Sequence, residues 1–342
     1  MKKIFLTVDT ECHDLGKANQ YIYGNKGKEA FGIVKILELA KELDLPVNFF
    51  LDVGECRKYG REFIQKIVDI IHSYNQPIFF HLHPDYISGD SSRTYLWEYS
   101  KEEQRQIIHN AVEDYKSFVD LNKNDLMVFR AGRYGVNLDT YDVLSELNYR
   151  ILDLSYLCDD GKMCRLPAEA IRVNNIPAKY KNILVLPNTR FIAFDLFGRK
   201  KCIGLDSADA TYFEFKKIIQ NTKLDNVVFT MHSWNFIKKW FFLENYFQGD
   251  KMMERKFRKS VAFARKHGFE FEDLRNFNTD DKSDVTDELI NIYEKNKINC
   301  VVNNFFRFMK IARLNKKYFF VYSLFYLTLF LIMLLILLMI LF

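Results

Sequence analysis

The stretch PIFFHLH, residues 77–83, joins a short apolar run to two histidines, and it indicates how the chain folds. So short an apolar run, bounded by a proline, is typical of a buried strand. Alternate residues of a strand point to the same face, so His81 and His83 are expected to share one face. We therefore predict a strand whose carboxyl end carries two imidazoles.

Other short apolar runs also end in polar residues, namely Asp9, Arg130 and His232. Between the runs lie stretches whose apolar residues recur at three and four, which is typical of amphipathic helices. These stretches are residues 29–43, 61–73, 101–120, 138–147, 211–221 and 254–267. Strands alternating with helices predict an α/β fold with a parallel sheet or barrel. Chemistry in such folds collects at the carboxyl ends of the strands, where these polar residues lie.

The pair His81 and His83 is suited to one metal ion, because neutral imidazole binds zinc, cobalt, nickel or iron. A carboxylate is the expected third ligand. Asp9 and Glu11 alternate at the end of the first predicted strand, so both are candidates. Two histidines and one carboxylate leave positions open for water and substrate, as catalytic metal sites require. The sequence thus predicts a catalytic site for a divalent metal.

Composition excludes some classes of function. The chain has 342 residues, of which 49% are hydrophobic, enough for one large barrel or two ordinary domains. Its net charge of +5 is mild, and no long basic stripe is present, so nucleic acid is not an expected partner. The six cysteines form no C-x-x-C pair, which argues against a disulfide framework.

Residues 319–342 contain no charged side chain and are mostly leucine, isoleucine, phenylalanine and methionine. As a helix rising about 1.5 Å per residue, this segment would cross the roughly 30 Å hydrocarbon layer of a membrane. Basic residues precede it, and such flanks favour the cytoplasm. We therefore expect a catalytic barrel at residues 1–276, a polar linker and basic amphipathic helix at 277–318, and a single-pass anchor at 319–342. The catalytic part is expected in the cytoplasm.

Four motifs, in this order, resemble those of the polysaccharide deacetylase (NodB-homology) family, carbohydrate esterase family four. They are TVDTE at 7–11, HLHP at 81–84, RAGRYG at 130–135 and MHSW at 231–234. The resemblance covers roughly residues 1–275. It implies a distorted (β/α)₇ barrel, a divalent metal that is usually zinc, and hydrolysis of an acyl amide on a sugar.

The resemblance also implies roles for individual residues. Glu11, His81 and His83 would hold the metal, and Asp9 would be the general base that takes a proton from the attacking water. Arg130 would pair with Asp9 and keep it ionised.

On the same basis, the backbone N–H of Tyr134 would contribute to the oxyanion hole, and His232 would protonate the leaving amine. Residues beside these motifs are expected to contact substrate: Asp85, Arg133, Asp153 and Trp234. Asp153 is also a candidate for tuning His232.

Two departures from the family pattern leave choices open. The family usually has adjacent acids in the first motif, whereas Thr10 separates Asp9 from Glu11 here, so either acid is a candidate ligand. The family usually has His-x-x-x-His in the second motif, whereas this chain has His-x-His, and Asp85 becomes a candidate ligand or substrate contact.

Three aromatic residues, Tyr95, Trp97 and Tyr99, follow the second motif in a predicted loop. They would either stack on a sugar ring or pack against the barrel rim, and the sequence does not choose between these two interpretations.

The predicted function is hydrolysis of an N-acyl amide, most readily N-acetyl, on an amino sugar of a polysaccharide or a lipid-linked glycan. The alternatives are an amide hydrolase acting on a C–N bond outside sugars, and an inactive scaffold that binds glycan.

Overall fold

A computed structural model gives the structure of the chain. It describes residues 2–12, 14–156, 163–166, 175–196, 199–239, 247–277, 290–293, 300–305, 307, 320, 324, 327, 328 and 331. Most of the predicted linker at 277–318 and of the predicted anchor at 319–342 lies outside these residues. Within the described part of the chain, no helix is both long and apolar enough to cross a membrane.

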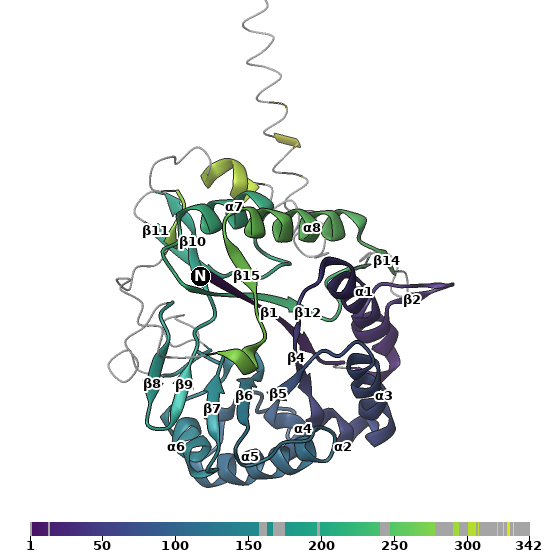
Figure 1. Ribbon diagram of the computed structural model, residues 1–342, viewed down its shortest axis with the longest axis vertical. Helices are drawn as coiled ribbons and strands as arrows, with labels where there is room; N and C mark the ends of the chain where they lie inside the picture. The colour runs from purple at the N-terminus through teal and green to yellow at the C-terminus, as the bar shows by residue number, and fades with distance from the viewer. Residues whose placement is uncertain are drawn as a thin grey trace, which may run out of the picture.

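One large, mostly parallel sheet runs through the molecule (Figure 1). Its hydrogen-bonded order is β12 (Asn226–His232), β1 (Lys2–Thr10), β4 (Asn48–Asp52), β5 (Ile78–Leu82), β6 (Leu126–Ala131), β7 (Arg150–Asp153), β9 (Ile183–Val185) and β8 (Ala178–Tyr180). A further strand, β15 (Phe269–Phe271), also pairs with β1. All these pairs are parallel except β8 with β9. The α/β class predicted from the sequence is confirmed.

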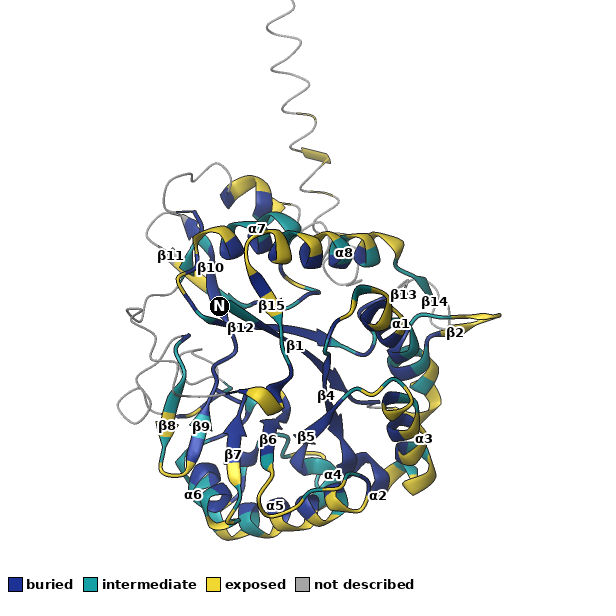
Figure 2. Cartoon of the chain, in the orientation of Figure 1, coloured by how far each residue is buried: buried dark blue, intermediate teal, exposed yellow. Residues whose placement is uncertain are grey.

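Helices cover the outer face of the sheet and bury only one side of themselves (Figure 2). The main helices are α1 (Ile33–Leu43), α3 (Arg61–His72), α5 (Lys101–Lys116), α6 (Leu138–Glu146), α7 (Tyr212–Asn221) and α8 (Lys251–Lys266), with short helices α2 (Cys56–Tyr59) and α4 (Pro84–Ser88). In α3 the buried residues are Ile64, Ile67, Val68 and Ile71, whose spacing of three and four matches the turn of a helix. The six helices predicted between the strands are each present within a few residues of their expected bounds.

Strand alternation separates two hydrophobic clusters. The larger cluster lies between the sheet and the helices and includes Ile4 and Leu6. A second cluster fills the inner face of the sheet, with Phe5, Phe50, Phe79, Val128, Leu152 and Val228 from six different strands. Since side chains from six strands meet in one cluster, the sheet curls around its inner face.

Backbone bonds bridge the gap that the named strands leave in the sheet. On the free side of β12, the backbone N–H of Thr230 in that strand donates to the Leu205 oxygen at 3.0 Å. The backbone N–H of Leu205 in turn donates to the Thr189 oxygen at 2.7 Å. Thr189 follows β9 closely, so irregular segments link the two ends of the sheet. Seven complete β/α units remain a prediction.

Smaller sheets occur where the sequence predicted none. They contain β10 (Arg190–Leu196) with β11 (Arg199–Gly204) and β16 (Ile290–Asn291), β13 (Ile237–Lys239) with β14 (Phe247–Gly249), and β2 (Asn25–Lys26) with β3 (Glu29–Ala30). Within the segment 277–318, expected to be a linker and an amphipathic helix, Ile290 and Asn291 instead pair with β10 as a strand.

Candidate metal and catalytic site

Glu11, His81 and His83 form the centre of the site. Oε2 of Glu11 lies 2.6 Å from Nε2 of His83 and 3.6 Å from Nε2 of His81. One ligand atom from each residue lies within 4.8 Å of the others, and all three residues are buried. Among the described residues no other group of histidine, cysteine and acidic side chains meets this criterion. The structure therefore brings together the three residues expected to hold a metal.

His81 is held in an orientation that suits a ligand. Its Nδ1 lies 3.0 Å from the backbone oxygen of Arg130. A carbonyl oxygen only accepts, so Nδ1 carries a proton, and in the neutral ring Nε2 is the nitrogen left to bind a metal. Metal-binding histidines usually have such a partner on the second ring nitrogen, which fixes the tautomer.

The position of His83 depends on the absence of a side chain at Gly132. A Cβ atom built on Gly132 would lie 2.5 Å from Nε2 of His83, closer than carbon atoms approach in proteins. Gly132 opens the short helix η5 (Gly132–Tyr134), in which Arg133 and Tyr134 have φ of 54° and 57°. A left-handed conformation costs on the order of 1–2 kcal/mol for such residues. This loop is therefore constrained beside a candidate ligand.

Asp9 lies next to this group but forms a separate pair. Its Oδ1 accepts a hydrogen bond from the Arg130 guanidinium, which is fully buried. Arg130 also donates to Thr7 Oγ1 at 3.0 Å and Asn188 Oδ1 at 3.3 Å, and its guanidinium lies 4.2 Å from the centroid of the Phe50 ring. With its partner fixed on several sides, Asp9 is held in one orientation. Asp9 is not part of the three-residue group, whereas Glu11 is.

His232 ends β12, the strand beside β1, and lies opposite Asp9 in the parallel register. Its Nδ1 is 3.6 Å from Oδ2 of Asp206, and its ring stacks on Trp234 with centroids 4.7 Å apart. Burial raises the pKa of the Asp206 carboxyl, while the charge of His232 opposes this rise. The side chain of His232 is 30% exposed, so it remains accessible to a substrate.

Asp206 and Asn188 are site residues that the sequence did not reveal. Asp206 follows β11, a strand too charged to be recognised as a buried strand, whereas Asn188 follows the apolar run 183–186, a strand end that the sequence prediction missed. The short run GLD at residues 204–206 is the signal closest to a marker, and it is too common to identify an acid partner of histidine.

Asp153 lies away from the site, contrary to its expected role. Leu152 and Leu154 face the inner cluster, so alternation directs Asp153 to the outer face. There it is fully buried and accepts hydrogen bonds of 2.5 Å from Tyr141 and Ser155. Burial raises its pKa to about 6. Its contacts are therefore structural, and Asp206 takes the place beside His232 that Asp153 was expected to fill.

The remaining expected contacts lie around the three-residue group. Asp85 is half-buried in the first turn of α4, directly after His83. Arg133 is exposed, and Tyr134 is half-buried, with burial raising the pKa of its hydroxyl. Trp234 covers one face of the His232 ring. No described contact tests whether these residues touch substrate.

A second set of acids lies behind the histidines. Asp52, at the end of β4, is opposite His81 in the sheet and is fully buried. Burial, together with the charge of Glu55, raises the pKa of Asp52 well above its ordinary value. Glu55 accepts a hydrogen bond from the Cys12 backbone at 2.7 Å. The sequence did not predict these two buried carboxyl groups beside the site.

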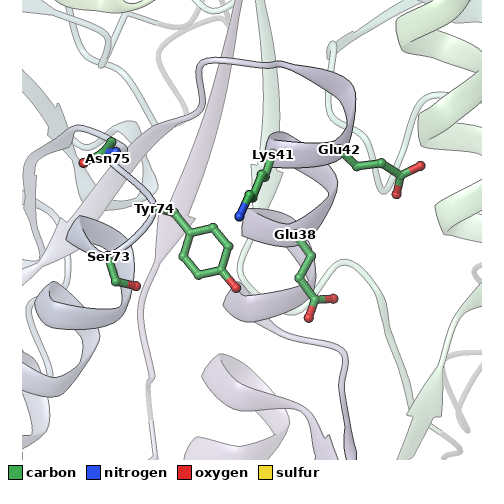
Figure 3. A pocket seen from close by; sticks show the side chains of 6 residues that line it. All are labelled: Glu38, Lys41, Glu42, Ser73, Tyr74 and Asn75. Carbon is green, nitrogen blue, oxygen red and sulfur yellow. The ribbon is translucent and has the colours of Figure 1, made fainter.

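A surface hollow of about 710 Å³ lies at the other end of the sheet (Figure 3). It is lined by Glu38, Lys41, Glu42, Ser73, Tyr74 and Asn75. These residues precede the starts of β4 and β5, whereas the histidines follow the end of β5. The hollow is therefore not part of the candidate site.

The chain is similar in structure to solved polysaccharide deacetylases. A Mycobacterium smegmatis protein named as a polysaccharide deacetylase is 14% identical, with 76% of this chain and 82% of that chain covered and a TM-score of 0.48. A polysaccharide deacetylase from Bacillus cereus is 13% identical, with 87% and 100% covered and a TM-score of 0.37. A family 4 carbohydrate esterase from Streptomyces lividans, solved in complex with acetate, is 9% identical, with 78% and 90% covered and a TM-score of 0.37. No protein-family model and no curated protein matches the sequence.

The geometry supplies three chemical capacities at one end of the sheet. Glu11, His81 and His83 offer a donor set for a divalent cation. Asp9, held by Arg130, is placed to accept a proton. His232, accessible and close to Asp206, is placed to donate one. Such a combination suits hydrolysis, in which water loses a proton and the leaving group gains one.

Proposed function

We propose that this chain is a metal-dependent hydrolase that removes an acyl group, most readily acetyl, from the nitrogen of an amino sugar. The observation that carries the proposal is the convergence of Glu11, His81 and His83 with the Asp9–Arg130 pair and His232 at the carboxyl ends of neighbouring strands. The order and spacing of the four sequence motifs support a sugar as the substrate.

The donor set fits a divalent ion such as Zn²⁺, and also Co²⁺, Ni²⁺ or Fe²⁺. Glu11, His81 and His83 would hold it, because their buried ligand atoms face one another and His81 is fixed through Nδ1. When bound, such an ion polarises the acyl carbonyl and makes water more acidic.

The residues of the chain would then move two protons. Asp9 takes a proton from the attacking water, and its hydrogen bond from Arg130 holds it in one orientation. His232 gives a proton to the amine nitrogen as the C–N bond breaks, and Asp206 stabilises the charged imidazole. The backbone N–H of Tyr134, in the constrained loop after Gly132, is our candidate donor to the oxyanion.

We also propose that residues 319–342 anchor the enzyme in a membrane, with the catalytic part on the cytoplasmic side. The uncharged sequence of that segment and the basic residues before it support this proposal. An enzyme held at the bilayer surface would reach a lipid-linked glycan, which is our preferred form of the substrate.

The test is acyl release by the purified, zinc-loaded chain from N-acetyl amino sugars, both free and lipid-linked, with cyclic amides as an alternative panel. We expect release from at least one sugar, and a loss of about 100-fold or more in kcat/KM for Asp9→Asn. Asp120→Asn, a change at an exposed aspartate, is the matched control and should retain full activity.

Release from cyclic amides alone would support a hydrolase acting outside sugars. No release from either panel, with glycan binding retained, would support an inactive scaffold. Equal activity of the Asp9 and Asp120 variants would remove Asp9 from the mechanism.

A further inference from the structure

Four side chains form a continuous stack beside the candidate site. The Arg165 guanidinium lies 3.3 Å from the centroid of the Trp97 ring. That ring is parallel to Tyr95, with centroids 4.7 Å apart and planes inclined by 15°. On the Tyr95 side, the Arg133 guanidinium lies 6.0 Å from the ring centroid. We call Arg133, Tyr95, Trp97 and Arg165 the arginine–aromatic stack.

The stack is packed against the loop that positions the candidate metal ligands. A Cβ atom built on Gly135 would lie 2.7 Å from Cδ1 of Tyr95, so that ring presses on the loop backbone. At its other end, the same loop packs closely against the His83 ring at Gly132, where there is no room for a Cβ atom. The stack is therefore one loop away from the candidate metal site.

Backbone contacts fix the far end of the stack. Trp97 Nε1 donates to the Met163 oxygen at 2.8 Å, and Arg165 N donates to the Val136 oxygen at 2.8 Å. The two rings cover one face of each other and the Arg165 guanidinium lies against Trp97, so the rings serve as a base that orients charge. Of the two interpretations left open by the sequence, this packing favours contact within the protein over direct stacking on a sugar.

The charges of the stack are not neutralised within the described part of the chain. Arg133 and Arg165 are exposed, and neither forms an ion pair with a described carboxylate. Arg93 in the preceding loop provides the contrast, since it lies 4.0 Å from the Tyr99 ring centroid and pairs with Asp90 and Glu103. Two oriented guanidiniums at the rim of a site, with no carboxylate partner among the described residues, are suited to carboxylate or phosphate oxygens.

We propose that the arginine–aromatic stack binds anionic groups on glycan units next to the sugar that is deacylated. This inference rests on the proposed function, and it adds that the substrate is an acidic glycan. The aromatic pair separates the two guanidiniums, so Arg133 would contact a unit near the reacting sugar and Arg165 a unit farther along. Both carboxylate and phosphate satisfy this chemistry.

The test is calorimetric binding to the purified full chain in detergent, which requires no turnover. The probes are a tetrasaccharide of alternating N-acetylglucosamine and glucuronic acid, neutral tetra-N-acetylchitotetraose, and tetra-N-acetylchitotetraose 1-phosphate. We expect an acidic probe to bind at least tenfold more tightly than the neutral one, and raised salt to weaken that preference. The acidic probe that shows the preference identifies carboxylate or phosphate as the recognised group.

Arg165→Gln should lose about tenfold in affinity for the preferred acidic probe and less than twofold for the neutral probe. Arg165→Lys, which keeps the charge but not the planar fork, should fall between the two. Arg61→Gln is the matched control, because Arg61 is an exposed guanidinium 4.3 Å from the Phe118 ring centroid on the outer helix α3. Arg61→Gln should bind all the probes as the unaltered chain does.

Equal binding of acidic and neutral probes would overturn the inference, as would equal losses for Arg165→Gln and Arg61→Gln. The outcome is separable from that of the proposed function. Acyl release without a charge preference in binding would contradict only the proposal that the substrate is acidic. A charge preference in binding without acyl release from any sugar would contradict the proposed hydrolase activity and would still support a binding site for acidic glycans.

Discussion

At the scale of single residues, the site depends on side chains that orient other side chains. The carbonyl of Arg130 sets the tautomer of His81, while the Arg130 guanidinium fixes Asp9. The sequence could predict the residues that end apolar strands, because a polar residue after such a run is easily recognised. It could not predict Asp206, which reaches His232 from an irregular segment.

Gly132→Ala tests how closely the loop and the metal ligand are packed. The added methyl group would lie within 2.5 Å of the His83 ring, so the ring must move away from Glu11. We expect a loss of about 10–100-fold in zinc affinity, measured by competition with a chromogenic chelator. Gly204→Ala is the matched control, because nothing lies within 4 Å of the Cβ position there. Equal zinc affinity of the two variants would contradict the close packing.

At the scale of elements, alternation along the strands decides which polar residues reach the site. Alternation places four site residues on the same face of the sheet as the inner apolar residues of their own strands, namely Asp9, His81, Arg130 and His232. Asp153 falls on the opposite face. The main helices and the parallel strands were predictable because their apolar periods are regular. Strands β8 to β11 were not, because they are short or charged, and β10 has a register shift between Ile192 and Phe194.

Asp153→Asn tests the outward placement of Asp153 through stability. Its pKa is about 6 in the folded chain and 3.8 ordinarily. Below about pH 4 the carboxyl is protonated in both the folded and unfolded states. As the pH rises toward 6, only the unfolded state ionises it freely, so the folded state becomes relatively less stable. We expect the free energy of unfolding of the unaltered chain to fall relative to Asp153→Asn by on the order of 2–3 kcal/mol between pH 4 and 6.

The measurement is urea unfolding at several pH values with metal chelated in both proteins. Above about pH 7, where the carboxyl is ionised in both states, the difference between them should be constant. Asp120→Asn, at an exposed position, should show no such trend. A difference between Asp153→Asn and the unaltered chain that is the same at pH 4 and pH 6 would contradict the burial of an ionisable Asp153.

At the scale of the whole molecule, the candidate site occupies the carboxyl ends of the strands. Described residues in the range 293–307, by contrast, contact helix α7. Arg307 pairs with Glu214 of α7, which is fully buried and also accepts a hydrogen bond from Tyr293 at 2.9 Å. Asn303 binds the Tyr293 hydroxyl at 2.6 Å. Tyr293, Asn303 and Arg307 are thus fixed to the outer layer of helices.

Deleting residues 319–342 tests the proposed anchor. Since the deleted segment has no charged side chain, we expect its loss to move the protein from the membrane fraction to the supernatant after centrifugation of a cell lysate. The purified truncated chain should still release acyl groups from free sugars, because the site residues lie in residues 9–234. Continued sedimentation of the truncated chain with membranes would contradict the anchor.

The central claim is that Glu11, His81 and His83 bind one divalent metal ion, and metal content by mass spectrometry tests it most directly. After loading with zinc and exhaustive dialysis, we expect one ion per chain, and less than about one tenth of this in His83→Ala. His109→Ala, at an exposed histidine of α5, is the matched control and should retain one ion. Equal metal content in His83→Ala and His109→Ala, or no retained metal in the unaltered chain, would contradict the claim.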